Sequence, residues 1–299
     1  MSVEITTAFV QQYKSNVLTL YQQAGSKLRG SVREEGITGK NYFFERLGAT
    51  AAVKRTTRHS DTPIVDSPHS RRMVTLVDYE WADLVDQVDK IRLLITPESE
   101  YARNAANALG RAYDDEVIAA FDGTAKSGET GATDILFAND WPVTRSGTEG
   151  DFDFSAAALT TPNVLTLKQA LDMRDVPPDG RYIVVSPPAI AQLLKASTAP
   201  LASSADYNTI RALMMGELDT WVGFKWITTT RLPINTGTDR KCFAWHRDAM
   251  GIAVGKDIET RITERADKSY SVQVYACGTY SSTRVQGEGV VRFLIDESL

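Results

Sequence analysis

Residues 216–233, GELDTWVGFKWITTTRLP, carry the side chains of this sequence that are best suited to binding by stacking. Two tryptophans and a phenylalanine fall within six residues, and such rings stack on nucleobases and sugars. The same residues alternate with smaller and polar ones, which is the pattern of a β-strand. One face of that strand comprises Val222, Phe224, Trp226 and Thr228. A β-branched strand with its aromatic rings on one side favours burial in a core over an exposed binding platform.

Two glycine-containing stretches resemble phosphate-binding loops but lack what such loops need. GIAVGKD at 251–257 has three residues between its glycines where the motif has four. Asp257 also stands where a Ser or Thr would hold magnesium. GITGKN at 36–41 departs from the motif in the same way. We therefore predict that residues 251–257 form a strand followed by a turn.

The sequence also contains no short motif that is typical of a catalytic or metal-binding site. It has no GxSxG elbow and no HExxH helix, and its three histidines are widely spaced. His246 follows Cys242 by four residues, but the alternating apolar residues there favour a strand, and we expect a core cysteine and a surface or turn histidine. A Ser-His-Asp or Cys-His site whose members meet only in the folded chain stays an alternative. Our prediction is no catalytic residue, no cofactor and no metal.

Length and composition are those of a folded protein that does not coat nucleic acid. The chain has 299 residues, 42% of them hydrophobic, with a formal net charge of -5. Binding along DNA phosphates needs a strongly basic surface, so any DNA contact is expected to be local and weak. Two cysteines without a CxxC pair fit a reducing compartment. The first residues, MSVEITTAFV, do not resemble a secretory signal, no apolar run approaches the about 18 residues of a membrane span, and no membrane partner is expected.

The spacing of apolar residues predicts helices joined to a long polar arm in the first half of the chain. A helix is expected over residues 6–23 and a longer one over 97–121, with Pro97 at its first position. Between them, residues 36–80 read as a two-stranded arm with a polar tip, its strands at 51–57 and 73–79. Such an arm has little core of its own and needs a neighbour to lie on.

In the second half of the chain, the pattern of apolar residues predicts alternating helices and strands, followed by strands alone. Residues 123–162 read as a loop in which Trp141 is an anchor point. The elements expected after it are a helix at 165–176, a strand at 182–185, a helix at 186–195 and a third helix around 210–218. From residue 243 onward strands dominate, with a hairpin at Ala266-Asp267-Lys268 and two further strands at 279–285 and 290–295. The predicted fold class is therefore α+β.

Charge is divided into two blocks along the first third of the chain. Residues 40–72 contain seven basic and three acidic residues, a net charge of +4, and residues 73–101 contain two basic and seven acidic residues, a net charge of -5. A basic arm followed by an acidic body suits a chain in which the arm of one copy lies on the body of the next. Two solvated faces are the alternative interpretation. The candidate contacts between copies are Arg55, Arg58, Arg71, Arg72, Asp83, Asp86 and Asp89.

Three stretches together resemble one known family. They are RHSDTPIVDSPHSRRMVTLVDYEWADLVD at 58–86, RYIVVSPPAIAQLL at 181–194, and residues 216–233. With the order of a helical start, basic arm, long helix, mixed passage and closing strands, the chain resembles the Hong-Kong-97-type major capsid protein of tailed bacteriophages over nearly its whole length.

The resemblance implies a fold, a domain division and a set of partners. An N-terminal arm would occupy residues 1–35, an extended loop 36–80, a peripheral domain with a spine helix 81–130 and 256–299, and an axial domain 131–255. The function would be self-assembly, as pentamers and hexamers, into an icosahedral shell around double-stranded DNA. The implied partners are further copies of the chain, a portal and possibly a decoration protein, and assembly would take place in the host cytoplasm.

The resemblance also raises the question of scaffolding. Some relatives carry a scaffolding segment of about a hundred residues before the arm, whereas here the spine helix begins at Pro97. We therefore expect a separate scaffolding protein. Two alternatives remain open: a nanocompartment shell that encloses an enzyme, and a soluble hydrolase or carbohydrate-binding protein that uses the tryptophan-rich segment.

Overall fold

A computed structural model describes residues 22–58, 61–85, 98–140, 151–154, 158–197, 212 and 219–298 of the chain. Several predicted features lie outside these residues: almost all of the helix at 6–23, nearly all of the helix around 210–218, and the side chains of Trp141, Asp86 and Asp89.

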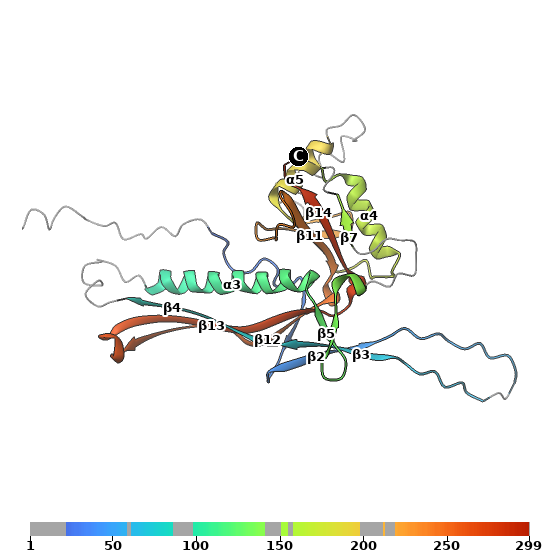
Figure 1. Ribbon diagram of the computed structural model, residues 1–299, viewed down its shortest axis with the longest axis horizontal. Coiled ribbons are helices and arrows are strands. Elements are labelled where there is room, and N and C mark those ends of the chain that lie inside the picture. The colour runs from blue at the N-terminus through green and yellow to red at the C-terminus, as the bar shows by residue number, and fades with distance from the viewer. Residues whose placement is uncertain are drawn as a thin grey trace, which may run out of the picture. The chain divides into compact units, whose positions relative to one another are not determined.

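The described residues form the following elements in chain order (Figure 1). The first half contains β1 (Arg33–Gly36), β2 (Asn41–Leu47), β3 (His69–Thr75), β4 (Val77–Val85), α3 (Glu98–Asp122), β5 (Ala125–Ser127), β6 (Thr133–Ile135), η1 (Phe137–Asn139) and β7 (Asp151–Asp153). The second half contains α4 (Thr161–Asp172), β8 (Arg181–Val185), α5 (Pro187–Ser197), β9 (Thr220–Trp221), β10 (Phe224–Thr228), β11 (Asp239–His246), η2 (Arg247–Ala249), β12 (Met250–Arg265), η3 (Ala266–Lys268), β13 (Ser271–Arg284), η4 (Gly287–Gly289) and β14 (Val290–Asp296).

The chain divides into two compact units. Unit 1 consists of residues 1–26, 77–114 and 255–280, and unit 2 of residues 27–76, 115–254 and 281–299. Helix α3 and strands β12 and β13 each contribute residues to both. The assignment of segments to arm, loop, peripheral domain and axial domain stays a prediction.

Unit 1 is built on the packing of α3 against strands. β13 pairs antiparallel with β4, from Val272 opposite Val85 to Tyr280 opposite Val77. Every second residue at the start of β13 is buried, as the alternation predicts. α3 runs beside β4 and β13 (Figure 1). Its Ala105 and Leu109 pack with Ala276 of β13, and the Tyr280 hydroxyl donates to the Leu109 carbonyl at 2.8 Å. The long helix and the β12–β13 hairpin are both confirmed.

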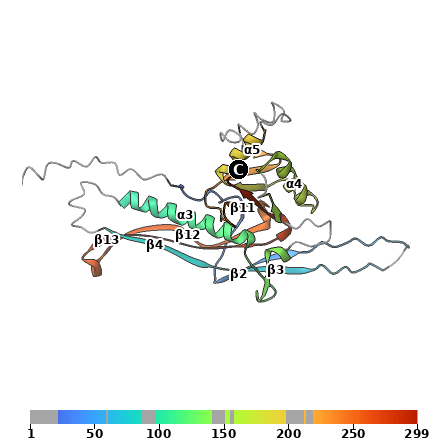
Figure 2. The same ribbon diagram turned by 45° about the horizontal axis from the view of Figure 1, so that its top comes forward.

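Unit 2 contains a six-stranded sheet in the order β7-β14-β11-β8-β10-β9, with α4 and α5 beside it (Figure 2). β8 pairs parallel with β10 and antiparallel with β11. Ile183, Val184 and Val185 of β8 are fully buried, which confirms the predicted short core strand. Trp245 of β11 lies between the rings of Phe121 and Tyr182, with centroids 4.6 and 5.8 Å away.

The arm exists, but its strands lie closer to its base than predicted. β2 and β3 pair antiparallel from Asn41 opposite Thr75 to Leu47 opposite His69. Residues 51–57 are not a strand, and the second strand is 69–75. The physical reason is that Phe44 and Val74 at the base are buried in a small core, whereas the segment beyond it is polar and contains Pro63 and Pro68, which have no N–H for a ladder.

Other boundaries also differ from the predictions. Residues 123–162 are not all loop, because they contain β5, β6 and β7. Residues 251–257 lie inside β12 without a turn, since residues 251–254 pair with β1. β13 is one strand to residue 284, so no new strand begins at 279. α4 starts and ends four residues earlier than predicted, because Pro162 suits its first turn.

Candidate assembly surface

The part of the extended loop beyond β2 and β3 presents exposed charged and apolar side chains. Arg55 and Arg58 are exposed, and the Arg55 Nε donates to the nearby Thr57 carbonyl at 3.0 Å. Ile64 is 92% exposed and Val53 59%. Exposed apolar side chains together with exposed arginines are typical of a surface that docks on another protein.

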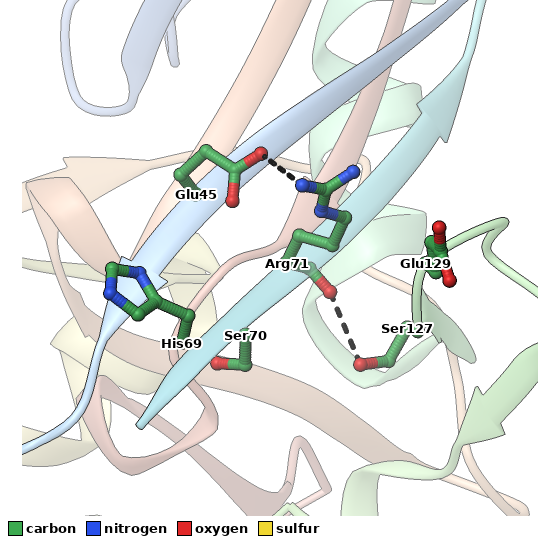
Figure 3. A pocket seen from close by; sticks show the side chains of 7 residues that line it. Glu45, His69, Ser70, Arg71, Ser127 and Glu129 are labelled. Carbon is green, nitrogen blue, oxygen red and sulfur yellow. Dashed lines mark hydrogen bonds and ion pairs between the residues drawn. The ribbon is translucent and has the colours of Figure 1, made fainter. Parts of the chain in front are cut away.

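Arg71 lies at the base of the loop, on the wall of a hollow of about 400 Å³ (Figure 3). Its guanidinium is 3.2 Å from a carboxylate oxygen of Glu45 and 5.3 Å from the centroid of the Phe43 ring. The Arg71 carbonyl accepts a hydrogen bond from the Ser127 hydroxyl at 3.1 Å. The remaining lining residues are His69, Ser70, Gly128 and Glu129. Arg71 is thus partly engaged within its own subunit but still open to solvent.

Arg72, another of the candidate contacts, is buried within its own subunit, and its contact with another copy stays a prediction. Its side chain is 5% exposed and forms a short ion pair with Asp140, which is 7% exposed. Burial lowers the pKa of Arg72 from its ordinary value, while the nearby Asp140 charge opposes that shift. Neighbouring residues of a strand point to opposite faces, so Arg71 and Arg72 have different environments although they are adjacent in sequence.

Asp140 also binds a second buried arginine, Arg284, at 2.8 Å. Arg284 donates in addition to the carbonyls of Phe121 and Gly123, both at 2.9 Å, and its guanidinium lies 5.2 Å from the Phe137 ring centroid. This cluster connects the base of the loop to the end of β13 through one carboxylate. Sequence reasoning missed it because Asp140 is 68 and 144 positions from its two partners, and no local pattern connects them.

Of the acidic candidates, Asp83 lies on β4, an edge strand of its sheet among the described residues. Asp83 is half-buried, and its carboxylate accepts from the Leu84 N–H at 2.8 Å. On the same strand the exposed Asp78 and Glu80 accept from neighbouring hydroxyls on β13. An edge strand with acidic side chains is protected from edge-to-edge pairing and offers charge to a basic partner. Asp86 and Asp89 lie outside the described residues.

The aromatic segment forms a tight hairpin, not a single strand. Val222 and Gly223 both have positive φ, 53° and 80°, and make the turn between β9 and β10. Phe224 is fully buried, as expected for a core strand. Trp221 and Trp226 are only half-buried and pack on each other with centroids 5.6 Å apart and a 42° tilt. Because the two rings contact one another at an angle, they do not form a flat stacking platform.

Cys242 and His246 are both buried in β11. Burial raises the pKa of the Cys242 thiol to about 12, which makes it unreactive near neutral pH. His246 is 9% exposed and its Nδ1 accepts from the Asp248 N–H at 3.2 Å, so the expected surface or turn histidine is instead a buried one at a strand end. Within the described ranges, no three His, Cys, Asp or Glu side chains gather as metal ligands would, and no helix is long and apolar enough to cross a membrane.

The difference between the two cysteines predicts their reactivity. An exposed-thiol reagent such as DTNB is expected to modify Cys277, which is half-buried, and to leave the fully buried Cys242 unmodified in the native protein. In denaturant both thiols should react. A Cys277→Ser variant is the control, because its native form should then give almost no reaction. Rapid modification of that variant under native conditions would contradict the buried position of Cys242.

The chain is similar to known proteins both in sequence and in fold. A family model described as phage capsid protein matches residues 5–297. The chain belongs to this family. The capsid structure of the cyanophage P-SCSP1u matches with a TM-score of 0.70 at 15% identity, covering 97% of this chain and 94% of that one. The capsid of Ralstonia phage GP4 also matches with a TM-score of 0.70, at 10% identity and 95% and 94% coverage. No curated protein matches the sequence closely.

A third capsid, of cyanophage Pam1, matches with a TM-score of 0.67 at 13% identity and covers 97% of each chain. The capsid protein therefore has the α+β, Hong-Kong-97-type fold. It is a structural protein of the virion, where copies of it build the phage shell. The nanocompartment, hydrolase and carbohydrate-binding alternatives receive no support from these comparisons.

Proposed function

We propose that this capsid subunit forms, as pentamers and hexamers, an icosahedral shell around double-stranded DNA, and that it performs no catalysis. The observation that carries the proposal is the extended loop, in which Arg55, Arg58 and Ile64 are exposed. A loop that exposes both an isoleucine and arginines is suited to contact with another copy. The surface that would receive it is the acidic edge strand β4.

The domain division implied by the family is part of the same proposal. Residues 1–35 would form the arm, 36–80 the loop, 81–130 and 256–299 the peripheral domain, and 131–255 the axial domain. Five strands of the six-stranded sheet fall in the range proposed for the axial domain, whereas β14 falls in the range proposed for the peripheral one. The packing of α3 on β13 supports the proposed peripheral domain. Contact with packaged DNA would be weak and local, given the net charge of -5.

Further partners are proposed from the family resemblance: a separate scaffolding protein, a portal and possibly a decoration protein, with assembly in the host cytoplasm. Sedimentation of the purified chain, with and without a coexpressed scaffolding protein, tests the shell and the scaffold separately. We expect large, uniform particles with the scaffold. A stable monomer at micromolar concentration under both conditions would refute the shell, and efficient closure into uniform shells by the chain alone would refute the need for scaffolding.

Reversal of charge on the loop is expected to impair assembly without unfolding the subunit. The double variant Arg55→Glu/Arg58→Glu should lower the yield of shells at least about tenfold, because like charges placed against an acidic surface cost several kcal/mol. Shell yield is measured by sedimentation and electron microscopy, and folding by circular dichroism.

A matched control changes the same charge elsewhere. Arg103 on α3 and Arg247 in η2 are both exposed, so Arg103→Glu/Arg247→Glu alters net charge equally without touching the loop. Normal shell yield is expected from this control. Equal yields from the loop variant and the control would refute the role of the loop arginines.

A further inference from the structure

The segment 22–26 is bound to one face of α3 by a row of hydrogen bonds within unit 1. The Gly25 N–H donates to Asn107 Oδ1 at 3.0 Å, and Gln22 Nε2 donates to Asn104 Oδ1 at 3.1 Å. Arg111 Nη1 donates to Gln22 Oε1 at 2.7 Å and to the Gln23 carbonyl at 3.2 Å.

Farther along α3, Asp114 completes the row. Its carboxylate accepts from Gln23 Nε2 at 2.5 Å and from the Ser26 hydroxyl. Asp114 is 1% exposed, and the segment supplies two donors to its buried carboxyl group. The helix residues that make these contacts recur at a spacing of three and four, which places them on one face of the helix. We call this face the α3 strip; it comprises Asn104, Asn107, Gly110, Arg111 and Asp114.

Gly110 lets the segment approach the helix at backbone distance. A Cβ atom at Gly110 would lie 2.6 Å from the Gly25 carbonyl carbon, 2.8 Å from its Cα and 2.9 Å from the Ser26 nitrogen. These are backbone atoms, so a larger residue at 110 would displace the segment. Glycine inside a helix costs about 1 kcal/mol relative to alanine. The close contact with Gly25 gives a structural reason for a glycine at the centre of the longest described helix.

The bound segment contributes no buried apolar side chain. Gln22 and Ala24 are exposed, Gln23, Gly25 and Ser26 are half-buried, and the first fully buried apolar residue after them is Leu28, which belongs to unit 2. Segments held by polar contacts and little buried apolar area open locally at low cost, whereas core elements open only when the protein unfolds. The contacts of the strip are therefore those of a reversible attachment.

We propose that residues 22–26 and the α3 strip form a latch that opens as one unit while the rest of the subunit stays folded. On the proposed shell function, opening the latch uncovers the α3 strip of the shell subunit. Closing it covers the strip again. The strip recognises a short extended segment of small and amide residues, mainly through its backbone and through carboxamide and carboxylate side chains.

Hydrogen exchange of the full chain, resolved at the Gly25 amide, tests the latch. Gly110→Ala introduces the clash described above. Arg111→Ala removes contacts to Gln22 and Gln23 but none to Gly25, so it reports whether the segment opens as a unit. We expect exchange at Gly25 to become about tenfold faster in both variants, the effect of losing one or two ordinary hydrogen bonds. Arg103→Ala, an exposed residue of the same helix, is the matched control and should leave exchange unchanged.

Hydrogen exchange in the interior of α3 distinguishes local opening of the latch from general destabilisation of unit 1. Amides around Leu109 should keep their protection in both variants, and unchanged exchange at Gly25 in both would overturn the proposal. Faster exchange at Gly25 and Leu109 together would also overturn it, because the segment would then be part of the cooperative fold. This measurement does not depend on shell formation, so its failure is distinguishable from failure of the proposed assembly.

Discussion

Replacement of Asp140 with alanine is expected to lower the free energy of unfolding by roughly 3–5 kcal/mol, the usual cost of leaving a buried charge without its partner. The variant leaves two buried guanidinium groups without their carboxylate. Arg72 loses its ion partner, and Arg284 retains only carbonyl acceptors. Urea denaturation of dissociated subunits, followed by circular dichroism, measures the change.

Two further variants test whether the stability lost in Asp140→Ala comes from the buried ion cluster. Asp151 pairs with Arg292 but its side chain is 37% exposed, so Asp151→Ala should cost no more than about 1 kcal/mol. Asp140→Asn keeps the shape and one acceptor oxygen, and its stability should fall between that of Asp140→Ala and the unaltered protein. If Asp140→Ala were no less stable than Asp151→Ala, the cluster would not stabilise the base of the loop as we infer.

Replacement of Trp245 with alanine is expected to destabilise unit 2 by roughly 3–5 kcal/mol. The indole is fully buried between Phe121 and Tyr182, and its Nε1 donates to the Ser31 carbonyl at 2.9 Å. The alanine variant loses the ring contacts and also leaves the Ser31 carbonyl without this donor. Chemical denaturation of the same kind measures the loss.

The half-buried Trp226 provides the control for ring burial. Its indole is only half-buried and packs on Trp221 at a hairpin, so Trp226→Ala should cost clearly less than Trp245→Ala. Trp245→Phe keeps one aromatic ring but removes the donor and part of the ring volume, so its loss should be smaller than that of Trp245→Ala and at least about 1–3 kcal/mol, the cost of an unpaired buried acceptor. Equal destabilisation by Trp226→Ala and Trp245→Ala would contradict the assignment of Trp245 to the core.

Elements with strong local patterns were predictable from the sequence. Three such patterns each lie within a short stretch of sequence: the apolar stripe of α3, the buried run of β8 and the alternation of β13. The strands β5, β6 and β7 were not predictable, because each has three residues and is stabilised by its partner strand. A strand of that length contains too little alternation to be recognised before its pairing is known.

In the tryptophan-rich hairpin, too, one feature follows from the local sequence pattern and another only from the pairing of strands. Alternation correctly predicted the burial of Phe224, but not the turn at Val222, where a β-branched residue has positive φ. Such residues avoid that conformation by themselves, so only the pairing of β9 with β10 explains it. The conformation of Val222 is therefore imposed by the hairpin and not by its own preference.

By itself the sequence determined the fold class, the family resemblance and the presence of a basic arm before an acidic strand. Only the tertiary structure decided which charges face solvent. Arg71 and Arg72 are equivalent in any count of charge, yet Arg71 remains partly exposed beside Glu45 and Arg72 is buried against Asp140. The physical reason is that successive residues of a strand face opposite sides, and the partner that neutralises Arg72 comes from 68 positions away along the chain.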